Sequence, residues 1–241
     1  MPRWSFFKKQ KIRIIMKSLL HIICSSFTAG LCIGIAGLAY LKNPDIIGAV
    51  LFGFGLLTVV HYKLKLYTGT AGFFTNKKEF FALFPILLGN ILGCAVAAAA
   101  FRYCMDVSSL SADIVAKRLS SNVLSCIILG IGCGFIMTTA VQFARENKFL
   151  PLLFGVPVFI MCGFYHSIAD AFYYATWLSF ENISQTSNVF IKWAVTVFGN
   201  FIGCNLYRML LSKWISADKN GTLSQKTSSI DANDSTYQKA C

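Results

Sequence analysis

Charged side chains are scarce in this 241-residue sequence, since only 13% of its residues are Asp, Glu, Lys or Arg. A soluble domain carries roughly 25% charged residues, so this chain has too little charge to cover a soluble surface. Acidic residues are the rarer sign, with 10 Asp and Glu against 22 Lys and Arg. Disorder is excluded because 15% of the residues are aromatic, whereas disordered chains are poor in aromatics. The composition predicts a protein immersed in lipid.

Sequence patterns for disulfides, metals and catalysis are also missing. The nine cysteines include no Cys-x-x-Cys pair, and most lie in apolar runs, where cysteine behaves as a small hydrophobe. We find neither a metal-ligand cluster nor a nucleophile at a recognisable spacing, so we expect no metal, no cofactor and no enzyme activity. We also expect no signal peptide, because the basic N-terminus leads into an apolar run too long for a typical h-region.

Six apolar stretches are candidates for membrane spans, which need about 20 mostly apolar residues each. Four are continuous, and these are Ser18–Leu41, Phe80–Phe101, Val123–Phe143 and Val189–Leu211. Two are interrupted, namely Ile46–Val60 with a break before Leu66, and Phe149–Phe164 with a break before the run resumes to Phe180. The predicted fold is an all-α membrane protein with six transmembrane helices. Its parts are a basic N-terminus (1–17), a six-helix domain (18–214) and a polar, disordered tail (215–241).

Lysine and arginine are distributed unevenly between the two ends of these segments. With the N-terminus inside, thirteen of the 22 lie near inner ends and five near outer ends. Cytoplasmic loops carry the excess of Lys and Arg, so we expect both termini to be cytoplasmic in the cell (inner) membrane. The net charge of +12 is thus explained by cations at the ends of the spans, which interact with the anionic lipids of the cytoplasmic leaflet. We therefore expect no nucleic-acid partner.

A six-residue pattern, Gly-Asn-x-x-Gly-Cys, occurs at 89–94 in the third segment and again at 199–204 in the sixth. The interrupted segments occupy matching places in two halves of three segments each. An odd number of spans reverses direction, so the halves are predicted to be inverted repeats. Inverted repeats with one broken helix each are typical of transporters and channels. Close helix packing is the alternative reason for the glycines.

Polar residues at the two interruptions are the candidate functional groups. His166 lies in the middle of a span, where polar side chains are costly, and an imidazole titrates near pH ~6.5. A packing histidine bonded to a carbonyl is the alternative. Asp170, four residues later, shares a helix face with His166 and could orient the imidazole. Thr68 offers a hydroxyl to an anion or bonds back to its own helix, and Lys63 and Lys65 beside it either serve a pore or snorkel to the surface.

These residues resemble those of the formate/nitrite transporter family over roughly residues 17–214. Gly-Phe-Tyr-His-Ser-Ile-Ala-Asp at 163–170 is similar to the family's Gly-Phe-Glu-His-Ser-Ile-Ala-Asn, and Leu-Tyr-Thr-Gly at 66–69 resembles its Leu-Phe-Thr-(Gly/Ser) loop. The Gly-Asn pairs of the repeat match the family's pairs in the same spans. The family consists of pentameric small-anion channels with an aquaporin-like fold. The resemblance therefore implies a homopentamer in the lipid bilayer with one pore per protomer.

The resemblance also implies roles for individual residues. His166 would be the central proton-donating histidine, Thr68 would help to position it, and Asp170, Asn90 and Asn200 would belong to the translocation path. The constriction would be formed by Phe52, Leu56 and Phe159, with Leu66 and Tyr67 completing a cytoplasmic slit. The anion-attracting cation of the outer vestibule would be Lys117 or Arg118. Apart from the resemblance, we expect Lys65 at the other break to attract anions as well.

The chain departs from the family pattern at four positions. Lys65 replaces an acidic residue, Tyr165 a glutamate, Asp170 an asparagine and Gly134 an asparagine. Lys65 and Asp170 either compensate one another or adapt the vestibule to a different anion.

The expected function is transport of small monovalent anions, formate or nitrite, as proton symport. A bare anion has a large desolvation cost in hydrocarbon, which protonation by His166 would remove. Hydrosulfide, acetate and lactate remain alternative cargoes. An aquaporin-type channel for neutral solutes shares the helix layout, but it needs two Asn-Pro-Ala boxes and the sequence has only Asn43-Pro44-Asp45. The sequence is also compatible with a membrane enzyme that uses His166 and Asp170, and with a sensor or scaffold whose pore is occluded.

Overall fold

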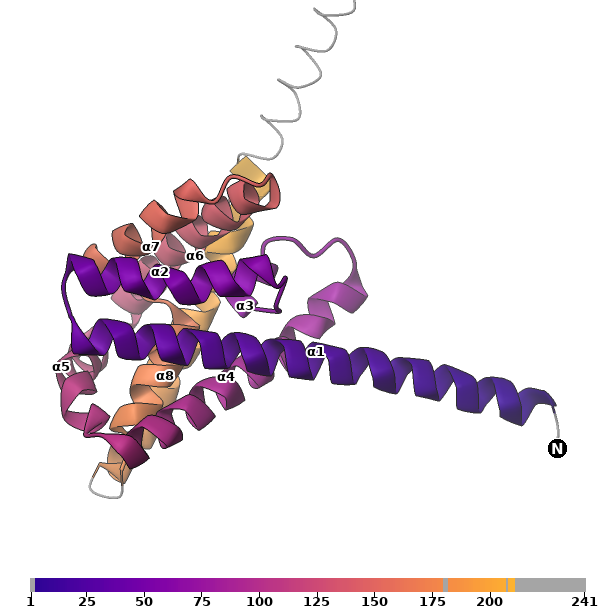
Figure 1. Cartoon of the computed structure of the whole chain (residues 1–241), viewed down its shortest axis with the longest axis horizontal. Helices are drawn as coiled ribbons and strands as arrows, with labels where there is room; N and C mark the ends of the chain where they lie inside the picture. The colour runs from indigo at the N-terminus through magenta and orange to yellow at the C-terminus, as the bar shows by residue number, and fades with distance from the viewer. Residues whose placement is uncertain (1–2, 180–181, 207, 211–241) are drawn as a thin grey trace, which may run out of the picture.

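The computed structural model describes residues 3–179, 182–206 and 208–210, and this part of the chain contains helices and no strand (Figure 1). The helices, in chain order, are α1 (Arg3–Lys42), α2 (Ile46–His61), α3 (Tyr67–Thr70), α4 (Lys77–Cys104), α5 (Val107–Ser120), α6 (Val123–Arg145), α7 (Leu150–Met161), α8 (Ser167–Trp177) and the 3-10 turn η1 (Ile183–Gln185). A last helix covers residues 186–206 and continues at 208–210. The all-α prediction is confirmed.

Four helical segments are long and apolar enough to cross a membrane: Met16–Lys42 within α1, α4, α6 and Ile183–Leu210. The other two apolar helices, α2 and α7, are shorter. Each is followed by a break and then by a second helix, α3 after α2 and α8 after α7. The six segments predicted from the sequence, with the second and fifth interrupted, are therefore the segments that the structure shows.

Two parts of the chain differ from the sequence prediction. Helix α1 begins at Arg3, within the predicted basic N-terminus, and runs on through the first predicted span, so that it projects beyond the helix bundle (Figure 1). Helix α5 was not predicted. It begins at Val107 after the N-cap Asp106, whose carboxylate accepts the N–H of Ser109, and hydrogen bonds from Ser109 lower the pKa of this carboxyl. The predicted tail, 215–241, lies outside the described residues.

Glycines allow the helices of each half to cross closely. Gly30 of α1 lies against the backbone carbonyl of Asn90 on α4, where an added Cβ would overlap that oxygen. In the second half, Gly134 of α6 meets the carbonyl of Asn200 in the last helix in the same way. The second glycine of each Gly-Asn-x-x-Gly-Cys pattern also touches the backbone of the facing helix. The predicted repeat therefore corresponds to two equivalent helix crossings, and its glycines serve packing.

The two halves interlock at the breaks. Helix α4 of the first half packs against α8 of the second, and α2 packs against α7. Helix α5 packs on α8, and the last turn of α5 contacts the first turn of α8 through Arg118 and Asp170. Each break therefore packs against helices of the other half, and the residues that end each break, Leu66 to Thr68 and Tyr165 to Ser167, are buried.

Candidate functional site

The two broken helices end with the same hydrogen bonds, one hundred residues apart. After α2, the N–H of Leu64 donates to the carbonyl of Val59 at 2.8 Å. After α7, the N–H of Phe164 donates to the carbonyl of Phe159 at 2.9 Å. Such bonds close a helix with one left-handed residue at its end.

That left-handed residue differs between the breaks. It is Lys63 after α2, with φ 52°, and Gly163 after α7, with φ 73°. Glycine adopts this conformation without steric cost, whereas a lysine carries a penalty of about 1 kcal/mol.

Asn90 of α4 holds the first break open. Its side-chain oxygen accepts the N–H of Tyr67 at 2.8 Å, and its amide nitrogen donates to the carbonyls of Ser26 (2.7 Å) and Lys65 (2.9 Å). The Tyr67 N–H and the Lys65 carbonyl have no helical partner at the break, and an unpaired buried backbone group would be costly in lipid, whereas the Ser26 carbonyl belongs to α1 and ties the asparagine to that helix.

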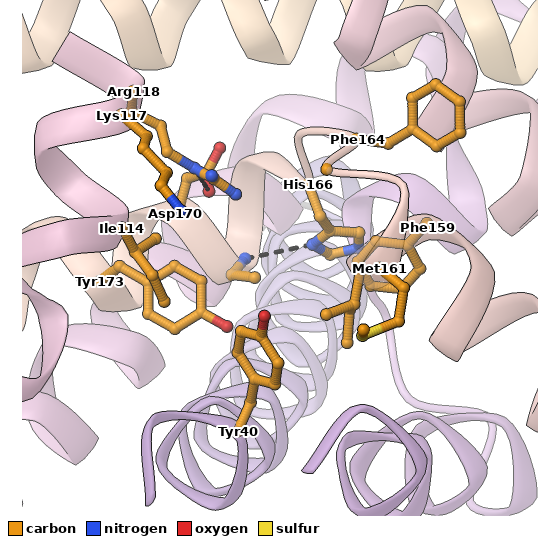
Figure 2. A pocket seen from close by; sticks show the side chains of 13 residues that line it. Tyr40, Ile114, Lys117, Arg118, Phe159, Met161, Phe164, His166, Asp170 and Tyr173 are labelled. Carbon is orange, nitrogen blue, oxygen red and sulfur yellow. Dashed lines mark hydrogen bonds and ion pairs between the residues drawn. The ribbon is translucent and has the colours of Figure 1, made fainter. Parts of the chain in front are cut away.

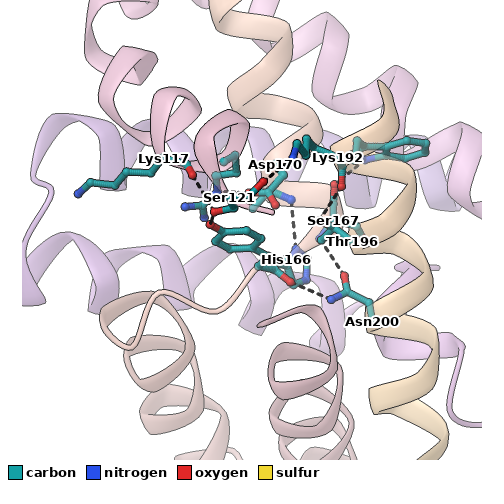
Figure 3. A network of polar contacts seen from close by, with 12 residues as sticks. Lys117, Ser121, His166, Ser167, Asp170, Lys192, Thr196 and Asn200 are labelled. Carbon is teal, nitrogen blue, oxygen red and sulfur yellow. Dashed lines mark hydrogen bonds and ion pairs between the residues drawn. The ribbon is translucent and has the colours of Figure 1, made fainter. Parts of the chain in front are cut away.

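Asn200 of the last helix does the same at the second break (Figure 3). It accepts the N–H of Ser167 and donates to the carbonyls of Gly130 and Tyr165, all at 2.8 Å. Both asparagines are fully buried, and neither lines the cavities described below. The sequence assigned them to the translocation path, whereas their amides are occupied by backbone groups that shape the breaks.

The cysteines of the repeat connect the two halves. The thiol of Cys94 lies 3.4 Å from the carbonyl of Ile168 in α8, and the thiol of Cys204 lies 3.3 Å from the carbonyl of Thr68 in α3. Sequence reasoning treated these cysteines as small hydrophobes and missed this contact. The available signal was their fixed place in the repeated pattern.

His166 is the N-cap of α8 and bonds to the opposite break. Its Nδ1 accepts the N–H of Ala169 at 3.1 Å, and its Nε2 lies 2.9 Å from Oγ1 of Thr68. Because Nδ1 accepts, we assign the proton of the neutral ring to Nε2, which donates to Thr68. Both side chains are buried, with exposed fractions of 1% and 0%. The predicted pairing of Thr68 with the central histidine is present in the structure.

Two cavities lie on either side of this pair. The histidine cavity, about 210 Å³, is shown in Figure 2. Its lining includes His166, Phe159, Tyr40, Tyr173, Lys117, Arg118 and Asp170. The lysine cavity, about 700 Å³, is lined at the first break by residues that include Leu56, Leu66, His61, Lys63, Lys65, Arg145 and Asn147.

An apolar wall separates the two cavities. The ring of Phe52 contacts that of Phe159 edge-on with centroids 5.9 Å apart, and Phe159 stacks on the imidazole of His166 at 5.6 Å. Leu56 and Leu66 close the wall on the side of the lysine cavity. All four apolar side chains are buried. The structure thus brings four of the five predicted constriction residues together.

Tyr67, the fifth predicted constriction residue, lies elsewhere. It lines neither cavity, and its hydroxyl points to the carbonyl of Val197 in the last helix at 3.5 Å. Tyr67 is the first residue of α3, and its N–H is bound by Asn90.

Asp170 pairs with Arg118, which bears on two predictions. Nε of Arg118 lies 3.0 Å from Oδ1 of Asp170, and the exposed fractions of the two side chains are 15% and 1%. Asp170 makes no bond to the imidazole of His166, whose ring nitrogens are occupied by Thr68 and Ala169. Lys65 lines the other cavity, so the ion pair of Asp170 does not support the alternative in which Lys65 and Asp170 compensate one another.

Tyr165 and Ser121 extend the Arg118 contact into a network (Figure 3). The guanidinium carbon lies 4.3 Å from the centre of the Tyr165 ring, and the Tyr165 hydroxyl is 2.6 Å from that of Ser121. Lys192 binds the Ser121 carbonyl. The sequence showed Tyr165 only as a departure from the family pattern. Lys117 lines the histidine cavity and is exposed, whereas Arg118 is paired with Asp170. Of the two vestibule candidates, Lys117 is therefore the one whose charge is not neutralised by Asp170.

We also looked for metal-ligating side chains near the breaks and elsewhere in the described residues. Among the residues that the structure describes, no group of three or more His, Cys, Asp or Glu side chains is arranged to hold a metal ion.

Comparison with known proteins identifies the class to which this fold and site belong. Residues 7–214 match the sequence profile described as formate/nitrite transporter. A formate-nitrite transporter of Plasmodium malariae is 24% identical over 228 residues, which are 78% of this chain and 73% of the relative. One from Plasmodium ovale is 28% identical over 119 residues, covering 44% of this chain and 38% of the relative.

Solved structures share the fold. One is described as a pentameric formate channel with formate bound; it has a TM-score of 0.72 and 19% identity, and the match covers 83% of this chain and 98% of that one. An ion channel of the same family gives a TM-score of 0.73 at 19% identity, with 85% and 93% covered.

The chain belongs to the formate/nitrite transporter family. It is a multi-pass membrane transport protein with the aquaporin-like fold rather than an enzyme, as the sequence predicted.

Proposed function

We propose that this protein forms a homopentamer in which each protomer conducts a small monovalent anion, formate or nitrite, together with a proton. The observation that carries the proposal is the buried His166–Thr68 pair, set in an apolar wall between two cavities lined by cations. A similar solved structure described as a pentameric formate channel supports the assembly and the class of cargo.

The arrangement explains why a proton would accompany the anion. Lys117 at the histidine cavity and Lys65 at the lysine cavity raise the local concentration of anions on either side. Between them the path narrows to Phe52, Phe159, Leu56 and Leu66, where a bare charge would lose its hydration without compensation. An anion that accepts a proton crosses this wall as the neutral acid.

The hydrogen bonds of His166 define how that proton is held. Nε2 donates to Thr68 Oγ1, so the Thr68 hydroxyl hydrogen is directed away from His166 and toward another acceptor. A doubly protonated ring also carries hydrogen on Nδ1 and must give up the Ala169 N–H contact. Protonation of His166 therefore requires the loss of its N-cap hydrogen bond to α8. The proton would reach the anion from Nε2, either directly or through the Thr68 hydroxyl.

Other titratable groups of the cavity modify this step. Asp170 with Arg118, Lys117, Tyr40 and Tyr173 face the same cavity as His166.

We place the protein in the cell (inner) membrane with cytoplasmic termini, from the Lys and Arg excess near the inner ends. The lysine cavity then faces the cytoplasm.

Formate uptake into proteoliposomes tests the proposal. We expect uptake to rise from about pH 7 to about pH 5, since protons are co-transported. Nitrite, hydrosulfide, acetate and lactate serve as competitors that rank the cargo. His166→Phe should abolish the pH-dependent uptake while the pentamer remains intact by size-exclusion chromatography. Unchanged uptake by this variant would contradict the role of His166, and flux of neutral glycerol but of no anion would favour the aquaporin-type alternative.

A further inference from the structure

The lysine cavity is larger and more basic than the proposed cargo needs. At about 700 Å³ it has more than three times the volume of the histidine cavity. Its basic lining residues are His61, Lys63, Lys65 and Arg145. No carboxylate is found among the described residues that line it. A formate or nitrite ion would neutralise one of these charges and fill a small part of the space.

Backbone strain is concentrated at this cavity. In the described part of the chain, positive φ occurs at two non-glycine residues, Lys63 (52°) and Asn147 (61°), and both line the lysine cavity. Gly163, the equivalent of Lys63 in the second half, shows that the fold accepts glycine at this position. Strained residues persist where the surrounding structure or a function requires their side chains. The strain at Lys63 places a cation at the cavity that glycine would not supply.

Contacts also fix the backbone of Lys65 and the guanidinium of Arg145. The N–H of Lys65 donates to Oγ of Ser25 at 3.0 Å, and its carbonyl accepts from Asn90. The guanidinium carbon of Arg145 lies 3.5 Å from the centre of the Phe73 ring. A stacked guanidinium keeps its N–H groups in the plane for an oxyanion.

The nearby carboxylates are engaged elsewhere. Glu79 accepts the N–H and hydroxyl of Thr75 at 2.7 and 2.9 Å, and Glu146 lies 3.5 Å from Nζ of Lys148. Neither carboxylate lines the lysine cavity. The charge of Glu79 acts on Lys65 through space, but the lining itself carries Lys63, Lys65 and Arg145 and therefore a net positive charge for a ligand.

The geometry points to a second anion site in the lysine cavity, which binds a phosphate group through Lys63, Lys65 and Arg145. A phosphate dianion neutralises more of this charge than a monovalent anion does, and its oxygens match the fork of a guanidinium. The group would come from a soluble phosphate ester or from a lipid headgroup, since basic pockets between transmembrane helices bind such headgroups. A phosphate here covers Leu56 and Leu66 and competes with the permeant anion. This inhibition rests on the proposed transport function, whereas the binding does not.

Binding of inorganic pyrophosphate to the purified full-length protein in detergent tests the site. Pyrophosphate should raise the thermal unfolding midpoint and give a measurable affinity by calorimetry. Lys65→Gln, which removes one charge-assisted contact, should weaken the affinity about tenfold. Lys63→Asn, which tolerates positive φ without the charge, should weaken it similarly, and Lys63→Arg should retain it. Lys148→Gln is the matched control, because Lys148 lies nearby and does not line the cavity.

Formate uptake identifies the source of the phosphate. In phosphatidylcholine vesicles, inhibition by pyrophosphate that Lys65→Gln relieves indicates a soluble ligand. Lower uptake in vesicles that contain phosphatidic acid, relieved by the same variant, indicates a headgroup. No pyrophosphate binding, or equal weakening by Lys65→Gln and Lys148→Gln, would overturn the site. If formate is not transported at all, the calorimetric result still decides the site, so the two proposals fail separately.

Discussion

Asn90 and Asn200 hold the two helix breaks with the same kinds of hydrogen bond, but the residues that begin the following helices differ. Leu66 precedes α3 and provides no side-chain cap, whereas His166 precedes α8 and caps it. Helix α3 has 4 residues and α8 has 11. The repeat therefore preserves the backbone that opens each break, and the second half alone carries an ionisable side chain at the N-cap.

The largest effects are expected where the two halves are equivalent. Asn90→Ala and Asn200→Ala each leave two buried backbone groups at a break without a partner, and each should lower the free energy of unfolding by about 2 kcal/mol. Thermal unfolding in detergent measures both. A loss at one asparagine and none at the other would show that the two breaks are not held in the same way.

The next effect belongs to the second half alone. Asp170→Ala leaves the Arg118 guanidinium without its carboxylate and should cost about 2–3 kcal/mol, below the range for fully buried pairs because Arg118 is partly exposed. The position one hundred residues earlier is Thr70, which bonds to the Leu66 carbonyl of its own helix. Thr70→Ala is therefore the control and should cost less in the same unfolding measurement.

A smaller effect is expected at the contact between the halves. Thr68→Val removes the acceptor of the His166 Nε2–H and should cost about 1–2 kcal/mol of stability. Proton-coupled uptake of formate should also fall, because the ring loses the partner that fixes its orientation. Thr68→Ser keeps the hydroxyl and should keep uptake. Equal uptake by the Val and Ser variants would remove Thr68 from the mechanism.

The smallest effects concern the left-handed residues. Lys63→Gly should stabilise the protein by up to about 1 kcal/mol, and Gly163→Ala should destabilise it by about 1 kcal/mol. No heavy atom lies within 4 Å of a Cβ built on Gly163, so the cost there is a backbone cost. Opposite signs in chemical denaturation would confirm that the two breaks share one conformation with different residues.

Much of the frame was predictable because it depends on local patterns. The apolar runs predicted the spans, the interruptions after Val60 and Phe164 predicted the breaks, and the Gly-Asn-x-x-Gly-Cys pattern predicted the repeat. In the structure the second break begins three residues earlier, after Met161. The family motif also brought His166 and Thr68 together across 98 positions of sequence.

The remaining contacts depend on side-chain choices between distant elements. Asp170 has Lys65 and Arg118 as candidate partners, and only the packing of α5 on α8 selects Arg118. Tyr67 adjoins the constriction in sequence, but its hydroxyl points to the carbonyl of Val197. Helix α5 was missed because its sequence has no long apolar run.

The central claim is that His166 does more than cap α8, and two substitutions separate these roles. His166→Phe removes both the cap and the proton, whereas His166→Asn retains a strong N-cap residue and removes the proton. The measurement is formate uptake by pentamers of wild type and His166→Asn at about pH 5 and about pH 7. The account predicts that His166→Asn assembles normally and loses the acid-stimulated uptake. Acid-stimulated uptake at the wild-type rate in His166→Asn would show that the histidine is a structural cap and would contradict the account.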